Sequence, residues 1–75
     1  MSYCRFNIRD DPPCDLYCWE AAEGFMTHVR GGPLRVDGDL AGFRARLLAL
    51  RAAGYRFPDH VLATVDAEIA DEAAP

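Results

Sequence analysis

The first thirty residues alternate in character along three short segments, and this alternation limits the available folds more than any other feature. It runs over residues 3–8, from Cys14 to about Ala21, and from Phe25 to Arg30. A repeat of two is typical of a strand that buries one face and exposes the other. The pattern therefore predicts three strands whose two faces differ strongly.

The breaks between these segments carry turn-forming residues. Two aspartates and two prolines at 10–13 interrupt the first strand, since proline cannot donate to a ladder. The second break, at 22–24, is short enough for a hairpin. The strands should therefore pair as an antiparallel meander.

We expect Cys4 to lie near Cys18 and Tyr17 near His28 in this meander. Alternation then defines a core face with cysteines and apolar side chains: Cys4, Phe6, Ile8, Cys14, Leu16, Cys18, Phe25, Thr27 and Val29. The outer face mixes aromatic and charged side chains: Tyr3, Arg5, Asp15, Tyr17, Trp19, Met26, His28 and Arg30. The core face is the one that helices should cover.

Two amphipathic helices are predicted in the second half of the chain, over 39–53 and 58–72. The first has Asp37 or Asp39 as its cap and carries an apolar stripe of Leu40, Phe43, Leu47 and Leu50. The second follows Pro58 and carries a stripe of Val61, Leu62, Val65 and Ile69. Residues 34–36 either add a short edge strand or cross over to the first helix.

These elements predict a single domain, 1–75, in the α+β class. Its sheet covers 3–30 as a three-stranded antiparallel meander, followed by two helices packed on one face, in the order β-β-β-α-α. The net charge of −4 argues against direct nucleic-acid binding. Without an apolar leader or a run long enough to cross a membrane, we expect a cytoplasmic protein without membrane contact.

The cysteines offer two kinds of chemistry, neither favoured. Three thiolates and His28 could bind zinc, but the spacing lacks a Cys-x2-Cys knuckle and His28 lies on the opposite face. A Cys4–Cys18 disulfide is conceivable across the ladder, yet a reducing compartment favours free, buried thiols. Neither His28 nor His60 has a catalytic partner at a recognisable spacing, so we expect no metal, no cofactor and no enzymatic activity.

Several segments resemble a family of small proteins encoded by bacteriophages and prophages of high-GC bacteria, a family without an assigned activity. The resemblance rests on the Met1–Phe6 start, Cys14–Tyr17, Gly24–Val29 with its Thr-His-Val strand, and the segments 43–48 and 53–59. It spans most of the chain. It implies an accessory protein in the host cytoplasm that inhibits or redirects a host protein, including defence machinery such as CRISPR effectors.

Two surfaces are candidates for binding that partner. The first is the aromatic side of the sheet, with Tyr3, Arg5, Tyr17, Trp19, Met26 and His28. The second is the acidic side of the last helix, which could enter a basic nucleic-acid-binding groove of an effector through Asp66, Glu68, Asp71 and Glu72. The alternatives are an intramolecular cover over the sheet, a homodimer that buries it, and an acidic face that is simply solvated.

The leading hypothesis is therefore a non-enzymatic inhibitor or modulator of a host protein. The alternative is a homo-oligomeric structural module or a minor component of a phage particle.

Overall fold

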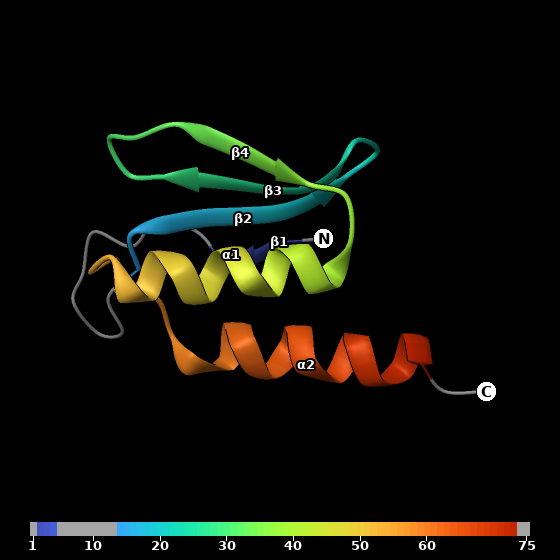
Figure 1. Ribbon diagram of the computed structural model, residues 1–75. Helices are drawn as coiled ribbons and strands as arrows, with labels where there is room; N and C mark the ends of the chain where they lie inside the picture. The colour runs from blue at the N-terminus through green and yellow to red at the C-terminus, as the bar shows by residue number, and fades with distance from the viewer. Residues whose placement is uncertain (1, 5–13, 74–75) are drawn as a thin grey trace.

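The computed structural model describes residues 2–4 and 14–73 and shows an antiparallel sheet with two helices on one side (Figure 1). The elements are β1 (Ser2–Cys4), β2 (Leu16–Ala21), β3 (Gly24–Val29), β4 (Leu34–Asp37), α1 (Leu40–Ala52) and α2 (Asp59–Ala73). The strands lie in the order β1-β2-β3-β4, each antiparallel to its neighbour. The α+β class is confirmed.

The predicted count of three strands is wrong, because residues 34–37 form a fourth strand. Gly31 adopts a positive φ of 70°, which lets the chain reverse tightly after β3. The reversal is closed by the backbone N–H of Val29, which donates to the carbonyl of Pro33 at 3.4 Å. The segment 34–37 therefore extends the sheet instead of crossing directly to α1.

The predicted register between strands is confirmed where it is described. Cys4 pairs with Cys18, and Tyr17 pairs with His28. The described residues predicted for the core face are buried: Cys4, Cys14, Leu16, Cys18, Phe25, Thr27 and Val29. The predicted positions of Arg5, Phe6 and Ile8 lie outside the described residues.

Tyr3 lies on the core side of the sheet, and its predicted place on the outer face is wrong. Ser2 pairs with Trp19 while Cys4 pairs with Cys18, so β1 carries one extra residue at this point. Such a bulge breaks the simple alternation of faces. Tyr3 is only 6% exposed and packs against the rings of both Phe25 and Phe43.

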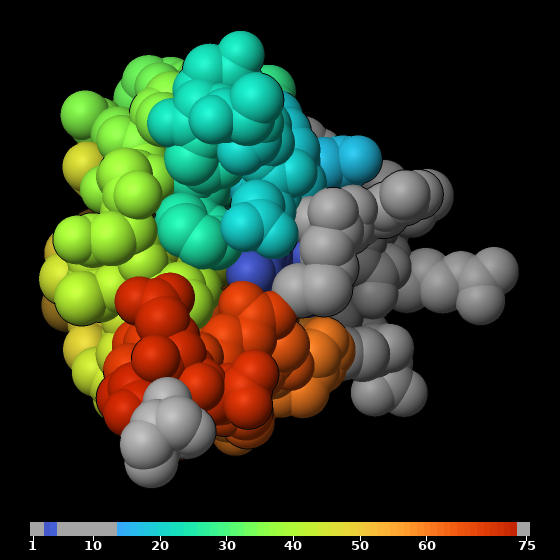
Figure 2. Space-filling view, turned by 90° about the vertical axis from the view of Figure 1, so that its right-hand side faces the viewer, coloured from blue at the N-terminus to red at the C-terminus, as the bar shows by residue number. Residues whose placement is uncertain are grey.

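Both helices present their predicted apolar stripes to the core. Asp39 caps α1 by accepting a hydrogen bond from the Gly42 N–H at 2.7 Å. Leu40, Phe43 and Leu47 of α1 are buried, as are Val61 and Val65 of α2. The end-on view in Figure 2 shows β1 (dark blue) between the β2–β3 turn (cyan) and α2 (orange to red).

The sequence favoured three free, buried thiols, and this expectation is wrong for two of the cysteines. A disulfide joins Cys4 to Cys14, whereas Cys18 is free and fully buried. Burial raises the pKa of the Cys18 thiol to about 12, against a smaller lowering by Thr27. Alternation places all three sulfurs on one face, so it could not decide which pair would bond.

The connection between the helices is fastened to the start of β2. The N–H of Asp15 donates to the carbonyl of Arg56, and the N–H of Arg56 donates to the Asp15 carboxylate, both at 2.8 Å. The Arg56 guanidinium also donates to this carboxylate. The hydrogen bonds from the Arg56 side chain, and to a smaller extent the one from its backbone N–H, hold the pKa of Asp15 below its usual range.

We predict that Gly24→Ala destabilises the fold by about 1–3 kcal/mol. Gly24 has a φ of 132°, and a Cβ there would lie 2.4 Å from the backbone oxygen of Asp37. Urea unfolding measures the effect. Gly38→Ala is the matched control, because a Cβ at Gly38 meets nothing within 4 Å. Equal stabilities of the two variants would contradict the close approach at Gly24.

We predict that Asp15→Asn lowers the free energy of unfolding by about 1 kcal/mol at neutral pH. Folding lowers the pKa of Asp15. The ionised carboxylate therefore stabilises the fold fully at pH values above its unfolded-state pKa of about 3.9, and this stabilisation is lost as the pH falls through the lower pKa of the folded state. Urea titrations of both proteins across this acid range should show their difference shrinking. A difference that is constant with pH would show that the charge of Asp15 is not responsible.

Candidate interaction surface

The side of the sheet turned away from the helices carries two rows of directly opposed side chains. One row is formed by Trp19, Met26 and Val36, each paired with the next across β2, β3 and β4. In the second row, His28 of β3 is paired with Tyr17 of β2 on one side and with Leu34 of β4 on the other. We call these six residues the outer patch.

The outer patch is exposed and largely apolar. Leu34 and Val36 are 50% and 48% exposed, and Tyr17, Trp19 and Met26 are half-buried. The rings of Tyr17 and Trp19 meet edge to face with centroids 4.9 Å apart. Directly opposed side chains in antiparallel strands are close neighbours, so the patch is continuous across three strands.

The outer patch contains four of the residues predicted for partner binding: Tyr17, Trp19, Met26 and His28. Tyr3 is not among them, because it is buried on the other face, and Arg5 lies outside the described residues. Sequence reasoning missed Leu34 and Val36. The signal was present in the alternation of residues 34–37 directly after a Gly-Gly-Pro turn, but four residues are a short pattern.

The acidic residues of α2 are divided between paired and solvated positions. Asp66 accepts a hydrogen bond from Arg44 of α1 at 2.5 Å, and Asp59 lies 3.2 Å from Arg51. Asp71 and Glu72 are exposed and form no ion pair with another described residue. The arginines of α1 therefore neutralise part of the charge that the sequence had suggested for this helix.

Glu68 of α2 forms a hydrogen bond with Tyr3 of β1. Its carboxylate accepts a hydrogen bond from the Tyr3 hydroxyl at 2.5 Å. Burial raises the pKa of Tyr3, and the hydrogen bond and the charge of Glu68 raise it further. The pair holds α2 to β1, and Glu68 remains partly exposed.

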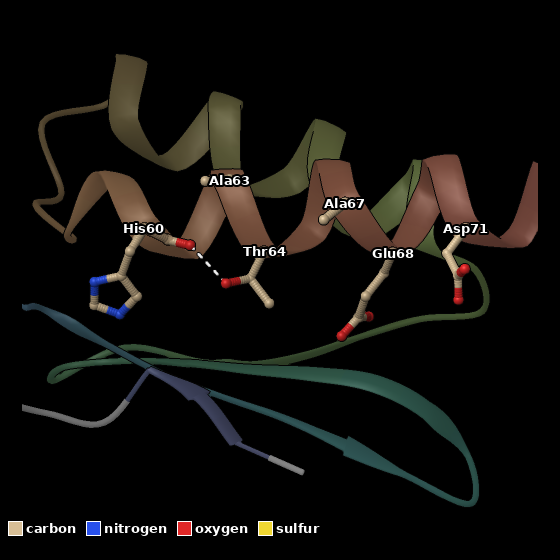
Figure 3. Close-up of a pocket in the computed structure, with 6 residues that line it drawn as sticks. All are labelled: His60, Ala63, Thr64, Ala67, Glu68 and Asp71. Atoms are coloured by element: carbon tan, nitrogen blue, oxygen red, sulfur yellow. Dashed lines mark hydrogen bonds between the residues drawn. The ribbon is translucent and has the colours of Figure 1, made fainter.

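A shallow groove runs along α2, lined by His60, Ala63, Thr64, Ala67, Glu68 and Asp71 (Figure 3). The Thr64 hydroxyl donates to the His60 carbonyl at 2.8 Å, so its proton is already engaged. His60 and Glu68 stand eight residues apart on one helix, about 12 Å along its axis. The imidazole and the carboxylate are thus too far apart to act as an acid–base pair.

The described residues hold no group of three or more His, Cys, Asp or Glu side chains that could bind a metal. Two of the four ligands considered for zinc, Cys4 and Cys14, are joined in the disulfide. His28 lies on the opposite face of the sheet from Cys18. The outer patch therefore stands out as a surface for contacts, and its residue types are those of protein interfaces.

Comparisons with protein-family models, curated proteins and solved structures found no match. In the part of the chain that the structure describes, no helix is both long and apolar enough to cross a membrane.

We predict that Leu34→Thr and Val36→Thr each change the free energy of unfolding by no more than about 0.5 kcal/mol. Both side chains lie on the outer face, half-exposed, and threonine keeps good strand propensity. Leu16→Ala, on the buried face, should cost about 2–5 kcal/mol. Chemical denaturation compares them, and a cost near that of Leu16→Ala at either outer position would mean that the patch is packed inside the protein.

Proposed function

We propose that the chain is a non-enzymatic binding protein that inhibits or modulates a host protein through the outer patch. The observation that supports this is the clustering of Tyr17, Trp19, Met26, Leu34 and Val36 on one exposed face. Tyrosine, tryptophan and methionine are enriched in protein interfaces, and aromatic anchors often dominate their energy. The two helices lie on the opposite face of the sheet and do not cover this surface (Figure 1).

A protein partner fits the patch better than a nucleic acid. Aromatic side chains on a sheet can stack bases, but single-strand binders add cations that track the phosphates. The outer patch contains no lysine or arginine, and the chain carries a net charge of −4. A negatively charged backbone would therefore be repelled overall.

The resemblance to phage and prophage proteins supplies the context of the proposal. It makes a host protein the target, with defence machinery such as a CRISPR effector as one class. The acidic end of α2 is a secondary contact in this proposal, since Asp71 and Glu72 are its solvated carboxylates. Two such charges support electrostatic steering of a basic partner better than they support full mimicry of a nucleic acid.

A homo-oligomeric module is the second candidate function. The feature that favours it is β4, which forms an edge of the sheet and exposes two large apolar side chains, Leu34 and Val36. Exposed edge strands of this kind readily pair with another chain.

The test is capture of proteins from a host lysate by the immobilised wild-type chain and three variants. Trp19→Ala removes the largest side chain of the outer patch. Leu48→Ala is the matched control, since Leu48 is 40% exposed on α1, away from the patch. Asp71→Asn tests the acidic end of α2. Circular dichroism confirms that each variant is folded.

The proposal expects one protein to be retained by wild type and Leu48→Ala and lost with Trp19→Ala. For a purified partner, loss of a central aromatic anchor should weaken binding by about thirtyfold. Unchanged capture by Trp19→Ala would overturn the assignment to the sheet. Selective loss with Asp71→Asn would place the contact on α2 instead.

A further inference from the structure

β4 is an edge strand whose two sides both meet solvent. In Figure 1 it forms the upper edge of the sheet. Leu34 and Val36 are about half exposed on the outer face, and Arg35, which points to the helix side, is exposed as well. Within 34–37 there is no proline or lysine of the kind that protects edge strands.

The backbone of β4 presents unused hydrogen-bonding groups along this edge. The N–H of Val29 donates to the carbonyl of Pro33, so Pro33 faces β3. Backbone groups alternate in direction along an antiparallel strand, so residues 35 and 37 also face β3. The N–H and C=O groups of Leu34 and Val36 consequently point away from the sheet.

We propose that β4 pairs antiparallel with β4 of a second copy of this chain, with Val36 opposite Val36 of the second copy. The pairing joins two four-stranded sheets into one of eight strands. A two-fold axis perpendicular to the sheet keeps the helices of both copies on the same side. This inference deepens the second candidate function, on which it rests, by naming the surface and register of the homo-oligomer, and it does not depend on the host partner.

The antiparallel pairing of β4 with its copy could be centred on Leu34, Arg35 or Val36, and the charges on β4 favour the register centred on Val36. In all three, the outward groups of Leu34 and Val36 can form hydrogen bonds with the second copy. Centring the pairing on Arg35 sets two like charges directly opposite each other, which is destabilising. Centring it on Leu34 sets Arg35 opposite Pro33. Only the register centred on Val36 sets Arg35 opposite an acid, Asp37 of the second copy, and symmetry makes this contact twice.

Both members of that charge pair are suitably placed. Asp37 is held by Arg46, whose guanidinium donates to its two carboxylate oxygens at 2.9 and 3.2 Å. The Asp37 side chain is 11% exposed, and a carboxylate has about four acceptor sites, so its exposed part can accept a second cation beside Arg46. Arg35 forms no ion pair with any residue that the structure describes. The second copy would supply the opposite charge that Arg35 lacks.

The same register makes the outer patch continuous between the two copies. Trp19, Met26 and Val36 are directly opposed within one chain. With Val36 opposite Val36, this row continues through the same three residues of the second copy in reverse order. Six side chains then form a single row across the joined sheets.

Sedimentation equilibrium over micromolar to millimolar concentrations tests the association. Wild type should approach twice the chain mass of 8.3 kDa. Val36→Pro removes the outward N–H at the centre of the pairing and leaves the hydrogen bonds to β3 intact, so it should weaken the dimer about tenfold or more. Val36→Thr keeps this N–H and should still dimerise. A wild type that remains monomeric throughout, or a Val36→Pro variant that dimerises equally well, would overturn the proposal.

Oxidative cross-linking tests the register. Val36→Cys places two thiols at a hydrogen-bonded pair, where the Cα atoms lie about 5.5 Å apart and within reach of a disulfide. Leu34→Cys is the control, because Leu34 would lie opposite Gly38 of the second copy. The natural cysteines should not interfere, since Cys18 is buried and the other two are joined. Cross-linking of Leu34→Cys as fast as Val36→Cys would exclude this register.

Discussion

Packing of three aromatic rings holds the two layers of this small protein together. Phe25 of β3 stacks on Phe43 of α1 with centroids 5.4 Å apart, and Tyr3 of β1 packs against both rings. The Tyr3 hydroxyl then reaches Glu68 of α2, so one side chain connects the sheet to both helices. Large aromatic side chains bury much apolar surface, which a chain of 75 residues needs because its core is small.

This cluster decides which face of the sheet remains open. Phe43 holds α1 and Glu68 holds α2 on the core side of the sheet through their contacts with Tyr3. Neither helix therefore covers Trp19 or Val36 on the outer face. The contact between α1 and β4 includes the ion pair of Arg46 with Asp37, and Arg35 remains exposed. The outer patch and the β4 edge are therefore both consequences of placing the aromatic cluster on a single side.

Alternation in the sequence predicted the faces of β2 and β3, because a repeat of two is unambiguous over six residues. Their register came from treating the short turn at 22–24 as symmetric, since a slip of two residues would leave the faces unchanged. It failed at Tyr3, since one extra residue in β1 reverses a face without any change in composition. It left β4 open, because four residues with two charges are also compatible with a crossover. Helical periodicity likewise identified the solvent side of α2, but it could not show that Arg44 reaches Asp66.

The exposed apolar side chains are better explained by a partner than by the stability of the monomer. Leu34 and Val36 are half in water and add little to the core, whereas transfer of apolar surface into an interface gains about 25 cal/mol per Å². Left uncovered, such a surface on an edge strand favours nonspecific association. A host protein would cover the side chains of the outer patch, while a second copy would use the backbone edge of β4. Because these are different groups of the same strand, the proposed dimer would present a continuous outer face to the proposed host protein.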